Sequence, residues 1–143
     1  MNDNEKKRKI TDTTCAPMLA IGLMSGTSLD GIDASIIKSN GEDGYKVVLD
    51  QYFKYDDKLY EELVDIRNKI NNTKDLKTNL IALSDIEKKI TLFHAFVSEK
   101  IINENDIDID LIGFHGQTIF HNANKKISKQ LGDAKLLSGL LRK

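Results

Sequence analysis

The sequence predicts an α/β fold, in which a three-stranded antiparallel meander is followed by two helices and by a strand parallel to the first. Three segments rich in apolar residues follow one another between residues 18 and 53 and are separated by glycine-containing turns. Apolar residues then recur at intervals of three and four over 76–101, which is typical of a long helix. A strand-like segment, 107–114, follows that helix, and this order favours a parallel crossover connection.

The first three strands have distinct patterns. Met18–Met24 is nearly all apolar, as expected for a strand buried on both faces. The segment 32–37 alternates and predicts a second strand with one better-buried face. After a turn signal at 40–44, apolar residues spaced by two predict a third strand over 45–53. Residues 1–17 are polar and are expected to form a disordered tail.

Two helices and a hairpin complete the prediction. The first helix is expected over 59–70, with Asp56 or Asp57 as its N-cap. The second, over 76–101, carries an apolar stripe, which favours a helix that covers the sheet over one that binds a partner. An exposed hairpin arm is expected over 125–131, followed by a short helix that Asp133 caps and that runs to Leu141.

Composition narrows the function classes. The net charge of −1 gives no electrostatic case for binding nucleic acid or an anionic membrane. No apolar run approaches the roughly 20 residues that a membrane helix needs. A basic cluster at 6–9 precedes the apolar run 18–24, but polar residues separate the two, so we do not expect a signal peptide. Cys15 is the single cysteine, which suits a reducing compartment, and we expect a cytoplasmic protein.

A glycine loop between the first two strands is the most informative motif. Ser25–Asp33 reads Ser-Gly-Thr-Ser-Leu-Asp-Gly-Ile-Asp. Such a loop can turn several N–H groups toward one anion, and glycine permits a positive φ and close approach of a ligand. Hydroxyls add donors, and carboxylates are oxygen ligands that Mg²⁺ prefers. The loop matches neither G-x-x-x-x-G-K-S/T nor G-x-G-x-x-G, so a site for a metal–triphosphate and a plain hairpin turn both remain open.

The loop supplies the candidate phosphate-binding residues, which are Gly26, Thr27, Ser28, Leu29, Asp30, Gly31, Ile32 and Asp33. Asp30 and Asp33 are also candidate Mg²⁺ ligands, acting through water. The alternative for Asp30 is a turn carboxylate that bonds its own backbone. The alternative for Asp33 is a solvent-facing strand residue.

Three blocks together resemble the anhydro-N-acetylmuramic acid kinase family. Ser25–Asp33 is similar to the opening signature of that family. Gly113-Phe114-His115-Gly116-Gln117-Thr118-Ile119-Phe120-His121 is similar to its G-x-H-G-Q-T-x-x-H segment, and Gln130-Leu131-Gly132-Asp133-Ala134 to its Q-I/L-G-D block. The resemblance runs from about Leu19 to about Ser138. It implies one subdomain of the actin/hexokinase-like (ribonuclease H-like) superfamily and a kinase that uses ATP and Mg²⁺.

The second block supplies candidate substrate-binding residues, which are His115, Gly116, Gln117 and Thr118. They follow a predicted buried strand, and ligand sites favour the carboxyl ends of such strands. Gln117 and Thr118 can bond sugar hydroxyls or an N-acetyl group, and His115 can donate or relay a proton. The alternative is a structural turn whose histidine bonds a carbonyl. Zinc between His115 and His121 is not expected, because no third ligand is evident, and His94 is expected to be a packing residue.

Family members continue beyond the Q-I/L-G-D block to a D-F-R segment with the catalytic aspartate, a G-G-Q-G-A-P-like segment and a second lobe. We therefore expect residues 18–143 to be a truncated N-terminal kinase lobe, with no catalytic residue in the chain and the general base beyond Lys143. Three functions remain open. The chain belongs to an enzyme that opens 1,6-anhydro-N-acetylmuramic acid with water and phosphorylates its 6-hydroxyl for cell-wall recycling. Otherwise it is an inactive remnant that binds at most a nucleotide or a partner, or one half of a split kinase whose C-terminal half is a separate chain. A homodimer partner is also left open.

Overall fold

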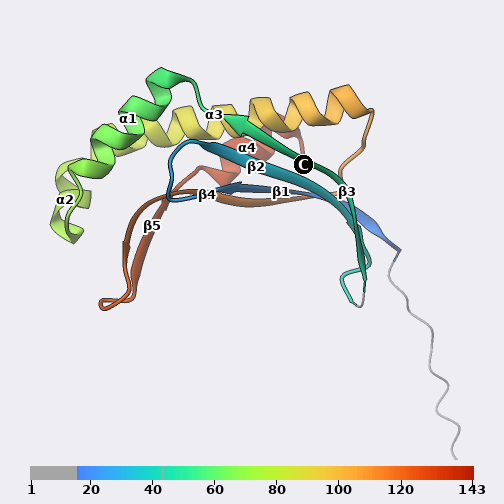
Figure 1. Ribbon diagram of the computed structural model, residues 1–143, viewed down its shortest axis with the longest axis horizontal. Helices are drawn as coiled ribbons and strands as arrows, with labels where there is room; N and C mark the ends of the chain where they lie inside the picture. Colours follow the sequence, from blue (N-terminus) through green and yellow to red (C-terminus); the bar gives the residue numbers. More distant parts are fainter. Residues whose placement is uncertain (1–15, 43) are drawn as a thin grey trace, which may run out of the picture.

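A computed structural model describes residues 16–42 and 44–143 and shows one five-stranded sheet with helices on one side of it (Figure 1). The strands are β1 (Met18–Ser25), β2 (Gly31–Ser39), β3 (Tyr45–Lys54), β4 (Leu111–Asn122) and β5 (Ile127–Leu131). The helices are α1 (Asp57–Asn68), α2 (Thr73–Thr78), α3 (Leu80–Asn105) and α4 (Ala134–Leu141). The predicted tail, 1–17, lies almost wholly outside the described residues, as does Cys15. No helix in the described part is long and apolar enough to cross a membrane.

The sheet has the order β3-β2-β1-β4-β5 and is mixed. The meander β1–β2–β3 is antiparallel and β4 pairs parallel to β1, which confirms the α/β prediction and its crossover. β5 pairs antiparallel to β4, which confirms the predicted hairpin, although its last residue, Leu131, is buried. In register, Ile21 of β1 lies opposite both Ile36 of β2 and Ile112 of β4, so apolar side chains line up on the face toward the helices.

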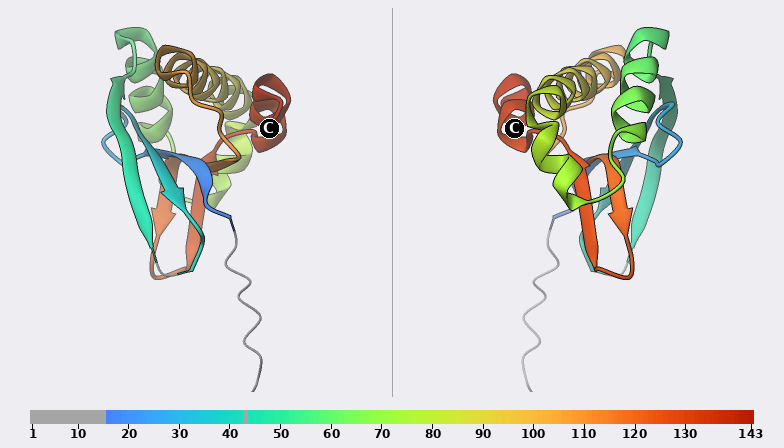
Figure 2. Two further views of the ribbon diagram at one scale, coloured as in Figure 1. Left: turned by 90° about the vertical axis from the view of Figure 1, so that its right-hand side faces the viewer. Right: turned by 90° about the vertical axis from the view of Figure 1, so that its left-hand side faces the viewer.

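The core lies between that face and the helices α1 and α3 (Figure 2). Ile21, Ile32 and Ile36 from the sheet are fully buried, as are Leu63 of α1 and Ile90 of α3. Removing these side chains from water stabilises the fold by about 2 kcal/mol each. The long helix α3 contacts β2, β4, β5 and α4, so it ties the sheet together.

The opposite face of the sheet is uncovered by any described element. Met18 and Met24 of β1 are 42% and 52% exposed, and Leu111 of β4 is 52% exposed. The prediction that β1 is buried on both faces is therefore wrong for this chain. Its apolar pattern is the pattern of a two-sided strand, but helices cover only one side here (Figures 1 and 2).

The single long helix predicted over 76–101 is divided in the structure. Asn72 and Asp75 form a capping box that starts α2 as a separate helix. Asn79 ends it, because its backbone leaves the helical conformation (φ −105°, ψ 19°) while its side-chain amide donates to the carbonyl of Asp75 at 2.9 Å. α3 then begins at Leu80, and Asp106 ends it in the left-handed conformation.

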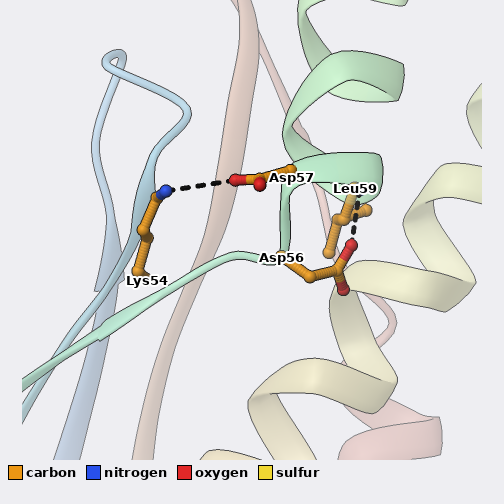
Figure 3. Close-up of polar contacts among 4 residues, drawn as sticks. All are labelled: Lys54, Asp56, Asp57 and Leu59. Atoms are coloured by element: carbon orange, nitrogen blue, oxygen red, sulfur yellow. Dashed lines mark hydrogen bonds and ion pairs between the residues drawn. The ribbon is translucent and has the colours of Figure 1, made fainter.

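The predicted N-caps are located by hydrogen bonds. Asp56, rather than Asp57, caps α1, since its carboxylate accepts the N–H of Leu59 at 2.9 Å (Figure 3). Asp57 instead forms an exposed ion pair with Lys54 at 3.1 Å (Figure 3). Asp133 caps α4 as predicted, because it accepts the N–H of Leu136 at 2.8 Å.

β4 differs from the predicted strand 107–114 at both ends. It begins at Leu111, because Asp110 bonds the backbone of Leu19 through its own N–H and through its carboxylate, both at 2.8 Å. It then continues to Asn122. Residues 115–118, which were expected to follow a strand, therefore lie inside β4.

Candidate functional site

The glycine loop joins β1 to β2 at residues 26–30, while Gly31, Ile32 and Asp33 belong to β2. Leu29 is 2% exposed and Ile32 is fully buried, so these two side chains belong to the core. They can contribute to a ligand site only through their backbone. The side chains available to a ligand are those of Thr27, Ser28, Asp30 and Asp33.

The loop obtains its turn from an unexpected residue. Leu29 adopts a φ of 64°, whereas neither Gly26 nor Gly31 has a positive φ, so that part of the glycine argument is wrong. A buried leucine tolerates this conformation because its packing offsets the strain. Gly31 is required for another reason, since a Cβ there would lie 2.3 Å from the carbonyl oxygen of Phe53. At Gly26 a Cβ would meet nothing closer than 3.6 Å, so this glycine leaves the loop open to an approaching ligand.

The backbone of the loop leaves donors available. The N–H of Leu29 donates to the carbonyl of Gly26 at 3.4 Å, and the N–H of Tyr55 donates to the carbonyl of Asp30 at 2.8 Å. Among the described residues, no hydrogen-bond partner accepts from the N–H of Thr27 or Ser28. Adjacent unpaired amides in a turn are the usual components of a backbone anion site.

A hollow of about 460 Å³ lies against this loop. Its walls come from both sequence motifs, namely Met24, Ser25, Gly26, Thr27, Ser28, Asp30, Gly31, Asp33, His115 and Thr118. The two motifs meet because β1 and β4 are parallel neighbours, so the carboxyl-terminal parts of both strands lie at the same end of the sheet. The hollow thus combines two free amides, the hydroxyls of four residues and two carboxylates.

Asp30 is held in its ionised form. The hydroxyl of Ser28 donates to its carboxylate at 2.5 Å, and this bond is the main cause that lowers the pKa of Asp30 below its ordinary value. The hydroxyl of Tyr52 acts in the same direction. In turn, partial desolvation and the charge of Asp30 raise the pKa of Tyr52. The carboxylate is therefore charged at neutral pH and available to a cation.

The second motif lies within β4, so the expectation that it follows the end of a buried strand is wrong. His115 and Gly116 form a bulge, since β4 shifts register against β1 between Phe114 and Gln117. Gly116 has a φ of 71°, and a Cβ there would lie 2.4 Å from the carbonyl oxygen of Leu131. His115 is exposed, and its Nδ1 lies 2.9 Å from the carbonyl oxygen of Gly116.

Gln117 points inward rather than into the hollow. It is fully buried, and its Nε2 donates to the carbonyl of Gly26 at 2.6 Å. The Gln117 side chain is thus bonded to the glycine loop, and its bond to a sugar hydroxyl stays a prediction. Of the predicted substrate-binding residues, His115 and Thr118 line the hollow, whereas Gly116 shapes the strand behind it.

Sequence reasoning missed a buried polar group behind the loop. The hydroxyl of Ser25 lies 3.0 Å from that of Tyr55 and 3.1 Å from Nε2 of His94. Burial lowers the pKa of His94 to about 4 and raises the pKa of Tyr55 to about 12, so both are neutral at pH 7. His94 does pack, with its ring 5.0 Å from that of Phe114, as expected. Its place four residues after the buried Ile90 was the sequence signal for its burial.

A second polar hollow of about 500 Å³ shares Thr27 and Thr118 with the first. It is lined by Arg67, Asn71 and His121, so the two histidines of the second motif face different hollows. Among the described residues there is no group of three or more His, Cys, Asp or Glu side chains placed to hold a metal ion.

Comparison with known proteins agrees with this architecture. Residues 18–141 match the family described as anhydro-N-acetylmuramic acid kinase. The chain is 56% identical over 124 residues to such a kinase from Pelagibacter ubique, an alignment that covers 87% of the chain and 33% of the relative. It is 35% identical over 125 residues to one from Agrobacterium fabrum and 37% identical over 126 residues to one from Brucella canis, each covering 83% of the chain and 33% of the relative.

The α/β fold and these matches place the chain among the sugar kinases. More particularly, it belongs to the anhydro-N-acetylmuramic acid kinase family. The chain spans about one third of the length of the curated relatives it matches. The sheet, the glycine loop and the β4 motif all lie within the matched residues.

Proposed function

We propose that this chain is the phosphate-binding part of a cytoplasmic, ATP-dependent kinase that converts 1,6-anhydro-N-acetylmuramic acid to N-acetylmuramic acid 6-phosphate. The observation that carries the proposal is the hollow in which the unpaired amides of Thr27 and Ser28 meet His115 and Thr118. The family names the reaction, and the hollow offers the chemistry that one of its substrates, ATP, requires.

The loop would hold the phosphates of ATP. Phosphoryl transfer depends mainly on positioning the phosphates and stabilising their charge. The amides of Thr27 and Ser28 and the hydroxyl of Thr27 are donors suited to phosphate oxygens. Because Gly26 has no side chain, a phosphate can reach the backbone closely there.

The acidic residues of the hollow fit a magnesium ion that accompanies ATP. Asp30 is ionised through its bond to Ser28, and Asp33 lies exposed on the same wall. Mg²⁺ bound to nucleotide phosphates takes one or two protein carboxylates and keeps several waters, so two carboxylates are sufficient. The ion would supply charge neutralisation, and these residues would orient it through water.

The sugar would approach from the β4 side of the hollow. His115 and Thr118 present a ring nitrogen and a hydroxyl there, which suit hydroxyl or amide groups of an amino sugar. The carboxylate that activates water in the family lies in a D-F-R segment, which this sequence does not contain. We propose that this carboxylate comes from the part of the kinase that corresponds to the remaining two thirds of the relatives.

The uncovered sheet face favours a second candidate, one half of a kinase assembled from two chains. Met24, Tyr52 and Leu111 are each about half exposed on that face. Sheets made only of parallel strands are covered on both faces, and the exposed Met24 and Leu111 lie on the one parallel pair of this mixed sheet, β1 and β4. A separate polypeptide equivalent to the rest of the relatives would cover these residues.

A chimera tests both candidates. Residues 18–141 replace the matched third of the Pelagibacter ubique relative, and formation of N-acetylmuramic acid 6-phosphate from the anhydro sugar, ATP and Mg²⁺ is measured. We expect the chimera to be active and its Gly26→Val variant to be inactive. A folded chimera without activity, beside an active parent, would contradict the proposal. Activity of the 143-residue chain alone would exclude the two-chain candidate, whereas activity only after mixing with the separate remainder would support it.

A further inference from the structure

Four buried polar side chains behind the glycine loop form one connected set. Ser25 Oγ lies 3.1 Å from His94 Nε2 and 3.0 Å from the Tyr55 hydroxyl. That hydroxyl lies 3.4 Å from Gln117 Oε1, and Gln117 Nε2 donates to the carbonyl of Gly26 at 2.6 Å. All four side chains are at most 1% exposed. They come from β1, the residue after β3, α3 and β4, so the set joins four elements to one loop carbonyl.

The direction of each hydrogen bond follows from His94. Its Nδ1 lies 2.8 Å from the carbonyl oxygen of Ile90, which can only accept, so Nδ1 carries the proton. In a neutral imidazole Nε2 then accepts, and the one proton of Ser25 is donated to it. The oxygen of Ser25 in turn accepts from Tyr55. Donation therefore runs from Tyr55 to Ser25 to His94, and the single Tyr55 proton is shared between Ser25 at 3.0 Å and Gln117 Oε1 at 3.4 Å, the second being the weaker branch.

The set restrains both ends of the loop. At the first end, Gln117 holds the carbonyl of Gly26 toward the protein interior. At the other end, the backbone N–H of Tyr55 donates to the carbonyl of Asp30 at 2.8 Å. A carbonyl oxygen facing an anion would repel it, so an inward carbonyl of Gly26 leaves the neighbouring amides as the groups that an anion meets.

We propose that His94, Ser25, Tyr55 and Gln117 are positioning residues that keep the glycine loop in its anion-binding shape. His94 and Tyr55 hold Ser25, the residue before Gly26, and Gln117 holds the carbonyl of Gly26 directly. None of them is a catalytic residue in this account. The proposal rests on the proposed function for the identity of the ligand, but the shape of the loop is measurable without a ligand.

The first test measures the loop in the full 143-residue chain. Hydrogen exchange of the Leu29 amide reports the turn, because this amide donates to the carbonyl of Gly26. Ile36, fully buried in the middle of β2, serves as the reference amide. His94→Leu removes the acceptor for Ser25, and we expect exchange at Leu29 to rise about tenfold with Ile36 unchanged. His94→Gln is the matched control, since its side-chain oxygen can accept from Ser25 and restore the slow exchange.

The second test measures the binding of Mg·ATP and the tautomer of the His94 ring. We expect His94→Leu to weaken calorimetric binding of Mg·ATP about tenfold, and His94→Gln to regain most of it. Nitrogen NMR of the His94 ring should show a protonated Nδ1 and an unprotonated Nε2. If His94→Leu does not fold, Ser25→Ala removes the same link with a smaller change of volume and is judged by the same criteria.

The outcomes separate this inference from the proposed function. Unchanged exchange at Leu29 in His94→Leu, equal acceleration at Leu29 and Ile36, or the opposite tautomer would each overturn the positioning role. Failure of the unmodified chain and of the chimera to bind Mg·ATP would overturn the proposed function. In that case the exchange experiment would still decide whether His94 positions the loop.

Discussion

Lowering the pH from 7 to 5 should destabilise the chain through His94. Burial is the main cause that lowers the pKa of this histidine from 6.5 to about 4. Ser25, Ile90 and Phe114, which contact its ring, carry no charge that would stabilise a protonated form. Between pH 6.5 and pH 4 the unfolded chain therefore binds a proton that the folded chain does not, so stability falls as the pH falls.

The magnitude follows from these two pKa values. Integrating the difference in bound protons from pH 7 to pH 5 gives a loss of about 2 kcal/mol in the free energy of unfolding. The loss begins near the unfolded pKa of 6.5 and would level off below pH 4. Such a change is a large part of the 5–15 kcal/mol that is roughly typical of a whole domain.

Urea denaturation at pH 7, 6 and 5 is the assay, with His94→Gln as the matched variant. Glutamine cannot titrate, so the difference in pH dependence between the two chains isolates His94 from the carboxylates and from the other histidines. We expect the unmodified chain to lose about 2 kcal/mol more than the variant. If the free energy of unfolding changes equally with pH in the two chains, His94 is not buried in its neutral form.

Two further comparisons test local features of the fold. Asp56→Ala removes the N-cap of α1 and should lower the free energy of unfolding by about 1 kcal/mol in thermal or urea unfolding. Lys54→Ala removes only an exposed ion pair and should change this free energy little. Equal effects of the two substitutions would contradict the assignment of the cap. Gly31→Ala should destabilise the chain by about 2 kcal/mol or more, because the new Cβ would lie 2.3 Å from the Phe53 carbonyl oxygen. Gly139→Ala in α4 meets no atom within 4 Å and should be neutral or stabilising by about 0.5 kcal/mol, and the opposite ranking would count against the described packing.

The sequence predicted the parts of the fold that depend on local patterns. Turn residues and alternation predicted the meander, and the order of helix and strand predicted the parallel pairing of β4 with β1. The cap at Asp133 was predictable because a capping carboxylate acts within one helical turn. The meeting of the two motifs at one hollow follows from the parallel pairing.

The features that the sequence did not predict are one local division and several that depend on distant contacts. The division at Asn79 arises because a side-chain amide competes with the helical pattern that the apolar stripe suggested. The positive φ of Leu29 depends on a buried pocket for its side chain, which no local pattern reveals. The contacts of Ser25 with His94 and of Gln117 with Gly26 join residues 69 and 91 positions apart, so only the folded chain shows them.

Binding of Mg·ATP to the chimera is the most direct measurement of the central claim, that the amides near Thr27 receive the phosphates of ATP. Calorimetric titration compares the chimera with its Gly26→Val variant, in which the new Cβ would meet only Ser28, at 3.6 Å, and no core residue. We predict clear uptake by the chimera and binding at least about tenfold weaker in the variant. Absence of uptake, or equal uptake by both proteins, would contradict the claim.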